Sequence, residues 1–167
     1  MLAKDPIKNL ITELKNLYDS TSDSNHKIYY SKLALIELCG WIELCIDEIL
    51  EKYIDAKLLK ISNINLAKNI FVKNTYGFEY DTNLRQLLIK LVGIVGVEEI
   101  EDVLEYDGGI YTLLKAQLNN LVALRNKAAH TTIAGVTHSY QSPHAILTNL
   151  NNIYTYLTKL ETVLFML

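Results

Sequence analysis

Three side chains near the end of a predicted helix, Arg125, Asn126 and His130, could together act on a phosphodiester. Imidazole can both give and take a proton near pH 7, which makes His130 a candidate general acid and base. Arg125 offers a planar guanidinium of fixed charge, whose donors match phosphate oxygens. Asn126 carries both a donor and an acceptor, so it could orient a hydroxyl or the imidazole.

Helix geometry limits how these groups can meet. Asn126 and His130 are four residues apart and share a helix face. Arg125 and His130 differ by about 140° around the axis and about 7.5 Å along it, so one straight helix does not bring them together. They would converge if the helix were distorted after Ala129, or if two copies packed with these helix ends across a two-fold axis. The spacing therefore favours a composite site in a homodimer.

A structural role is the alternative for the same residues. Arg125 and Lys127 would then be solvated cations near the helix C-terminus, and His130 would cap the helix. The chain holds only 2 Arg against 14 Lys, so arginine is rare where any cation would serve. This composition favours a specific role for Arg125.

Several further residues are candidates for a site around this motif. Lys127 could contact the phosphate backbone of RNA, and Tyr140 could stack on a base. Glu43 and Glu37 lie among apolar residues of a long predicted helix, so one of them could orient Arg125 or His130. We take Glu43 as a possible supporting residue, although a solvated position on the helix surface is the more common outcome.

The histidines and cysteines do not predict a metal site or a disulfide scaffold. His130, His138 and His144 have neither cysteine nor carboxylate beside them, and their spacing matches no tight zinc pattern. Cys39 and Cys45 are six residues apart on a helix, where small core side chains are the usual interpretation. We therefore expect no metal and no other cofactor.

The elements that must position the motif are predicted to be helical. We expect helices over about residues 5–18, 27–59, 64–75, 81–95, 97–106, 110–130 and 143–167, with a break at Gly96 and a loop over 131–141. No strand alternation, repeat or long linker is visible. The sequence predicts a single domain over residues 1–167, an all-α, up-and-down bundle of four to five main helices.

Composition excludes several other classes of protein. The 167 residues are 50% apolar with 7 Gly and 2 Pro, which argues against disordered, collagen-like or turn-rich β proteins. The N-terminus lacks the apolar core of a signal peptide, and no apolar run is long enough to span a bilayer. We expect a cytoplasmic protein without membrane contact.

Charge is distributed unevenly along this weakly acidic chain. Residues 1–107 hold 12 Lys and Arg against 18 Asp and Glu, whereas residues 108–160 hold four cations and no acid. An acid-free segment can present a local positive potential to an anion. Chance composition of a polar segment explains the same pattern equally well.

The motif and the helix order resemble the HEPN superfamily, whose ribonuclease members carry Arg, a polar residue that is often Asn, three variable residues and His. Arg125, Asn126 and His130 match this pattern position by position, and Gly40-Trp41-Ile42-Glu43 is similar to part of the second main helix of such domains. The resemblance implies metal-independent RNA cleavage, in which a 2′-hydroxyl attacks the adjacent phosphorus and leaves a cyclic phosphate and a 5′-hydroxyl. It also implies a homodimer, and often a toxin of a toxin–antitoxin or phage-defence system with a cognate antitoxin protein. The acidic overall charge departs from that of a typical free-standing nuclease.

Two alternative functions use the same features. A non-catalytic helical module would bind a partner protein, such as a nucleotidyltransferase or an antitoxin. A nucleotide-binding regulatory domain would use Arg125 and Lys127 to hold phosphates.

Overall fold

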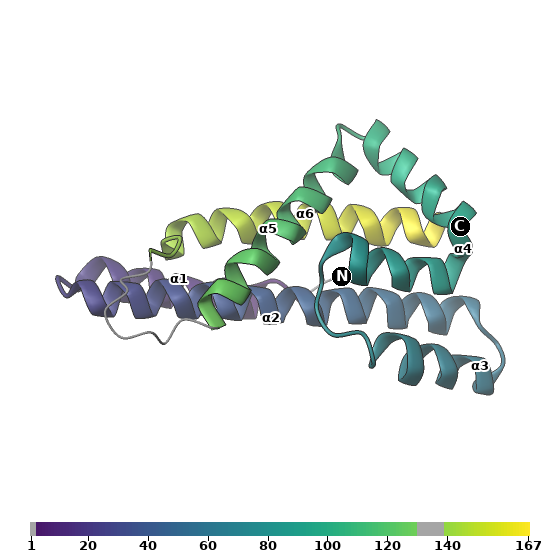
Figure 1. Cartoon of the computed structure of the whole chain (residues 1–167), viewed down its shortest axis with the longest axis horizontal. Coiled ribbons are helices and arrows are strands. Elements are labelled where there is room, and N and C mark those ends of the chain that lie inside the picture. The colour runs from purple at the N-terminus through teal and green to yellow at the C-terminus, as the bar shows by residue number, and fades with distance from the viewer. Residues whose placement is uncertain (1–2, 130–138) are drawn as a thin grey trace.

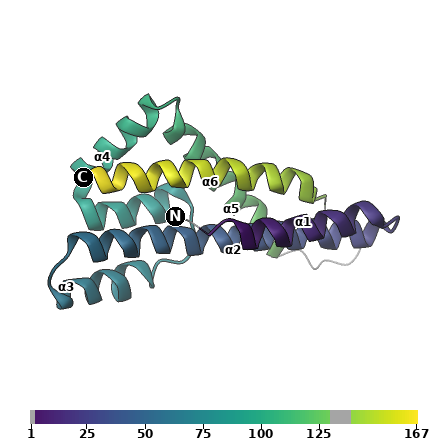
Figure 2. The same cartoon turned by 180° about the vertical axis from the view of Figure 1, so that it is seen from behind.

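The computed structural model describes residues 3–129 and 139–167, and every regular element within these ranges is helical. Figures 1 and 2 show an elongated bundle in which α2 and α6 run along the long axis. The elements are α1 (Asp5–Ser20), α2 (Ser24–Lys57), α3 (Ile61–Leu66), the π-helical turns η1 (Ala67–Val72) and η2 (Tyr80–Leu84), α4 (Arg85–Tyr106), α5 (Ile110–Ala129) and α6 (Pro143–Met166). The expected all-α class is confirmed.

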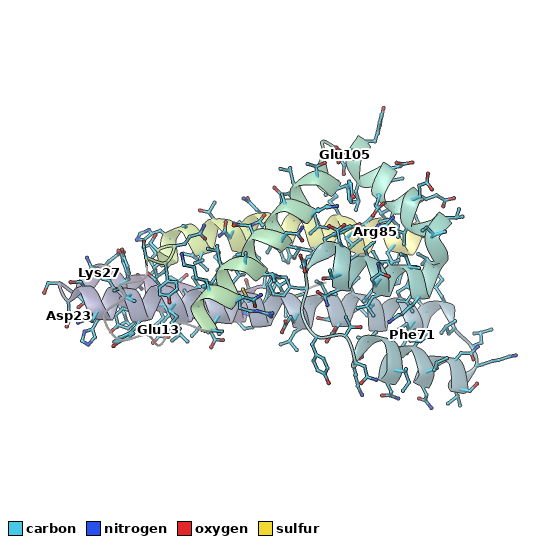
Figure 3. The ribbon with its side chains drawn as sticks, viewed as in Figure 1. Glu13, Asp23, Lys27, Phe71, Arg85 and Glu105 are labelled. Carbon is cyan, nitrogen blue, oxygen red and sulfur yellow. The ribbon has the colours of Figure 1, made fainter. Side chains whose placement is uncertain are left out.

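The long helix α2 is the element on which the others pack. Its N-cap is Asp23, whose carboxylate accepts hydrogen bonds from the backbone N–H groups of Asn25 and His26. This N-cap lies at one end of the molecule in Figure 3. Buried residues then recur every three or four positions, which turns one face of α2 to the core and leaves another to solvent. Helices α1, α5 and α6 and the turn η1 all contact α2.

Helices α1 and α6 pack on α2 through stripes of buried apolar side chains. In α1 the buried residues are Ile7, Ile11 and Leu14, and Trp41 of α2 donates its indole N–H to the carbonyl of Ala3 at 2.7 Å. This hydrogen bond attaches the start of α1 to the middle of α2. Ser142 is the N-cap of α6, and the helix buries eight side chains: Pro143, Ile146, Leu150, Ile153, Leu157, Leu160, Val163 and Leu164.

Helix α4 bends sharply at Gly93, three residues before the break that the sequence predicts. Gly93 has φ 73° and ψ 171°, a conformation that is open essentially only to glycine. Gly96, where we expected the break, is instead a buried helical residue whose added Cβ would lie 2.9 Å from Cβ of Val92. In Figure 1 the part of α4 after the bend rises away from the bundle, and α5 returns from it across α2.

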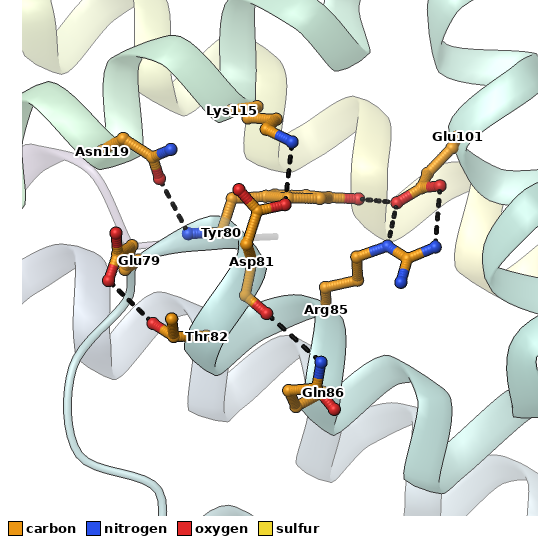
Figure 4. A network of polar contacts seen from close by, with 9 residues as sticks. All are labelled: Glu79, Tyr80, Asp81, Thr82, Arg85, Gln86, Glu101, Lys115 and Asn119. Atoms are coloured by element: carbon orange, nitrogen blue, oxygen red, sulfur yellow. Dashed lines mark hydrogen bonds and ion pairs between the residues drawn. The ribbon is translucent and has the colours of Figure 1, made fainter.

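A polar network ties η2 to the bent α4 and to α5 (Figure 4). The hydroxyl of the fully buried Tyr80 donates to Glu101 at 2.9 Å, and Arg85 donates to the same carboxylate at 2.8 Å. The backbone N–H of Tyr80 donates to Oδ1 of Asn119 on α5. Burial beside Glu101 raises the pKa of the Tyr80 hydroxyl, so it stays protonated and remains a donor. The network fixes η2 relative to α4 and α5.

Other predicted boundaries differ from the structure by a few residues. The helix expected from about 27 begins at Ser24, and the one expected over 64–75 is α3 followed by η1. Most of the loop expected over 131–141 lies outside the described residues. Within the described part of the chain, no helix is both long and apolar enough to cross a membrane.

We expect Gly93→Ala to destabilise the fold by about 1–3 kcal/mol, because alanine is strained at this positive φ. Gly40→Ala is the matched control, since Gly40 is helical and an added Cβ would meet nothing within 4 Å. It should stabilise the fold by about 0.5–1 kcal/mol through the helix propensity of alanine. Urea unfolding at low protein concentration measures both changes. Equal effects of the two substitutions would contradict the bend at Gly93.

Candidate functional site

The guanidinium of Arg125 lies where α5 crosses the middle of α2. Its Nη1 donates to Oε1 of Glu43 at 2.5 Å, and its Cζ lies 5.3 Å from the centre of the Phe78 ring. Phe78 is fully buried, so the ring is a fixed surface beneath the cation. The Arg125 side chain is 29% exposed, so the guanidinium is held from two sides and still reaches solvent.

The apolar face of α5 brings Arg125 to this place. Leu114, Leu118 and Leu121 are buried, and Ala128 is buried beyond the arginine. The Sγ atom of Cys39 lies 3.9 Å from the carbonyl oxygen of Leu121, which shows how closely α5 approaches α2. A larger side chain at position 128 would hold the end of α5 away from its neighbours.

The two cysteines are not reactive groups in this structure. Cys39 and Cys45 are both buried, and burial raises the pKa of each thiol to about 12. Because the thiolate is the nucleophilic form, neither cysteine supplies a nucleophile. The expectation of small core side chains agrees with their positions.

Of the other residues that the sequence predicts for the site, Asn126 lies beside Arg125 in the structure. Asn126 is exposed, and its Oδ1 lies 3.5 Å from Nη2 of the arginine, at the limit of a hydrogen bond. Lys127 is exposed on the same turn, and Tyr140 is partly buried and packs against the core. His130 lies outside the described residues. Arg125, Asn126 and Glu43 are thus brought together, while the catalytic roles of Arg125 and Asn126 and the supporting role of Glu43 stay predictions.

Acids from residues 1–107 pair with Lys115, Arg125 and Lys159 of the acid-free segment. Lys115 donates to Asp81 and Lys159 to Asp107, both at 2.8 Å, and Arg125 pairs with Glu43. These carboxylates offset the positive potential that the sequence pattern allowed.

A small cavity adjoins the arginine and contains side chains that sequence reasoning did not single out. It has a volume of about 240 Å³ and lies between α2 and the segment that leads to η2. Its lining residues are Glu43, Ile46, Asp47, Val72, Lys73, Thr75, Tyr76, Gly77, Leu84 and Leu87. Asp47 follows Glu43 by one helical turn, a spacing that could have indicated it. No sequence signal linked Phe78 or Lys73 to Arg125, because they come from a distant segment.

Asp47 is the perturbed carboxyl group of this region. Burial, together with the charges of Glu51 and Glu43, raises its pKa from 3.8 to about 6. Within the described residues Asp47 has neither a hydrogen bond nor an ion pair that would offset this cost.

The prediction that no metal is bound stays a prediction. In residues 3–129 and 139–167, no three His, Cys, Asp or Glu side chains are close enough to hold a metal ion. His144 instead lies 2.9 Å from Asp19, and this hydrogen bond lowers the pKa of the aspartate. His130 and His138 are outside these ranges.

A helical bundle with Arg125 and Asn126 near the end of its penultimate helix, and with His130 four residues after Asn126 in the sequence, is the arrangement that a HEPN domain implies. A family model described as RiboL-PSP-HEPN matches residues 4–164, and the chain belongs to this family. Searches of curated proteins and of solved structures find no match. HEPN domains are often ribonucleases.

We expect Asp47→Asn to raise the free energy of unfolding at pH 7.5 by about 1 kcal/mol, after allowance for the screening of a half-exposed group. Because folding raises the pKa of Asp47, its ionised form costs stability above pH 6, and the cost disappears as pH falls towards 3.8. Thermal unfolding of both proteins between pH 4 and 8 tests this, with Glu98→Gln, at an exposed carboxylate of α4, as the control. A stability difference that stays constant down to pH 4 would show that the carboxyl group is not perturbed.

Proposed function

We propose that this protein is a metal-independent endoribonuclease that acts as a homodimer. The observation that carries the proposal is the position of Arg125, whose guanidinium is held by Glu43 and Phe78 at a solvent-accessible helix end. Asn126 lies beside it, and His130 follows one turn later in the sequence. Membership of the HEPN class supports the same activity.

Each group has a role in attack by the ribose 2′-hydroxyl on the adjacent phosphorus. His130 takes the proton of the 2′-hydroxyl as the new P–O bond forms, and an imidazolium at the site gives a proton to the departing 5′-oxygen. The products are a 2′,3′-cyclic phosphate and a 5′-hydroxyl. Arg125 stabilises the charge that develops on the phosphorane, and Asn126 orients the hydroxyl or the imidazole. Glu43 acts through Arg125, because its carboxylate limits the orientations of the guanidinium.

Two protons move in this reaction, and a second copy of the chain would supply a second imidazole. At about 100° per residue, an exposed stripe of α2 lies on the same side of the helix as Glu43. It contains Tyr29, Leu33, Ile36, Gly40 and Leu44, of which Leu44 is 69% exposed. An apolar face beside the site supports a dimer in which both copies contribute to one centre.

The same proposal includes a biological role for this nuclease. We propose that it acts in the cytoplasm as a toxin or phage-defence protein and that a cognate antitoxin protein binds it. This role rests on the resemblance of the motif to that of HEPN toxins. The apolar α2 face would equally suit a protein partner of a non-catalytic module, so activity must decide between the two functions.

We expect purified protein to cut single-stranded RNA in the presence of EDTA and to leave cyclic phosphate ends. His130→Ala and Arg125→Ala should each lower the rate by about 10²-fold or more, since each removes one catalytic group. Lys159→Ala removes a cation of the same segment that is paired with Asp107, and it should cut at the wild-type rate. Gel analysis of end-labelled RNA gives rates and end groups, and thermal unfolding confirms that the variants fold.

Growth after expression of the wild type and of His130→Ala tests the toxin role separately. Slower growth with the wild type alone would support it. Intact RNA in vitro together with equal growth would overturn the nuclease proposal and favour the binding module.

We expect the double substitution Leu33→Glu and Leu44→Glu to produce a monomer that cuts RNA at least tenfold more slowly, because charges on an apolar interface oppose association. Ile61→Glu is the control, since Ile61 is 75% exposed on α3 and lies outside the α2 stripe. Light scattering after gel filtration gives the oligomeric state, and the RNA assay gives the activity. A fully active monomer would contradict the composite site.

A further inference from the structure

The cavity beside Arg125 has the construction of a binding site for one planar ring system. We call its buried apolar lining residues the floor, Glu43 and Asp47 of α2 the wall, and the exposed Lys73 and Tyr76 the rim. The floor residues Ile46, Val72, Leu84 and Leu87 are all buried. Cavities of about 300–1,000 Å³ hold drug-sized ligands, so 240 Å³ suits a single ring system.

The rim of this cavity is held in place by its own hydrogen bonds. The side-chain amide of Asn83 donates to the carbonyl of Tyr76 at 3.0 Å, and Gly77 follows with φ 97°. Tyr76 is 85% exposed, although it is a large aromatic side chain on an ordered segment. An exposed ring at the mouth of an apolar cavity is a platform on which a base can stack.

The two carboxyl groups of the wall, Glu43 and Asp47, differ in whether they already accept a hydrogen bond. Glu43 already accepts a hydrogen bond from Arg125. Asp47, one turn further along α2, accepts none from the described residues, and it lines the cavity. At neutral pH an ionised carboxyl group offers acceptors alone, so it needs a ligand with donors.

Among the four RNA bases, guanine matches a carboxylate best. Its Watson–Crick edge presents two adjacent donors, N1–H and the N2 amino group, which can bond both carboxylate oxygens. Adenine and cytosine place an acceptor nitrogen beside their amino group, and uracil flanks its one N–H with two carbonyl oxygens. A carboxylate would meet repulsion from these acceptors, whereas hydrogen bonds to an ionised group are the strong ones.

We propose that the cavity binds a guanine base of the RNA, with Asp47 as acceptor and Tyr76 as stacking surface. The inference rests on the proposed nuclease function, because it places this base next to the phosphate on Arg125. Glu43 joins the two places, since it lines the cavity and holds the guanidinium. Lys73 at the rim, whose Nζ now donates to Asn69 at 3.0 Å, is positioned to meet a phosphate of the same strand.

The test compares binding of the 3′-monophosphates of guanosine, adenosine, cytidine and uridine to the full chain by ligand-observed NMR. The wild type should bind the guanosine nucleotide most tightly. Asp47→Asn should weaken that binding by roughly tenfold or more, since it replaces one acceptor by a donor. The amide matches the donor and acceptor of adenine, so the same variant should gain relative affinity for the adenosine nucleotide. Glu51→Gln removes a charge one turn away that does not line the cavity, and it should keep the guanine preference.

Cleavage of a mixed-sequence RNA by the same proteins separates this inference from the nuclease proposal. Cuts next to guanine in the wild type, lost in Asp47→Asn and kept in Glu51→Gln, would support both. RNA cleavage without base preference, together with no preference among the nucleotides, would overturn the guanine site and leave the nuclease standing. Guanine-selective binding without any cleavage would keep the site and overturn the nuclease.

Discussion

The contact between Arg125 and Glu43 is the interaction on which the candidate site depends. A guanidinium near the end of α5 would otherwise sample many orientations, because its side chain is long and partly exposed. The carboxylate on α2 and the Phe78 ring restrict it to one place. This place exists only because the buried leucines of α5 pack across α2. The packing of two helices therefore sets the position of a group that could meet a phosphate.

The same contact has an electrostatic consequence. Glu43 neutralises part of the charge of Arg125, and other acids pair with Lys115 and Lys159. A ligand at this site would gain less from long-range attraction than the sequence pattern allowed, and more from directed hydrogen bonds at short range. A weakly acidic chain attracts an anion little at long range, so binding of such a ligand through a shaped cavity and fixed donors agrees with this composition.

Periodicity predicted the helices well, because each one buries a regular stripe of apolar side chains. The stripes of α1, α2, α5 and α6 recur every three or four residues, and this pattern is visible without coordinates. The sequence predicts the break in α4 at Gly96, whereas the bend lies at Gly93, because both glycines interrupt the same apolar run and only packing distinguishes them. Gly96 is buried, which leaves Gly93 as the residue free to adopt a positive φ.

The sequence by itself determined the helical class and the resemblance to the HEPN superfamily, because these depend on local spacing and residue type. Tertiary structure decided that Glu43, which the sequence offered only as a possible supporting residue, pairs with Arg125, and that Phe78 lies beneath the guanidinium. It also decided that the segment before η2 closes a cavity over Asp47. These contacts join residues that are tens of positions apart in the sequence. They depend on how the helices cross and bend, and a local sequence pattern does not encode that arrangement.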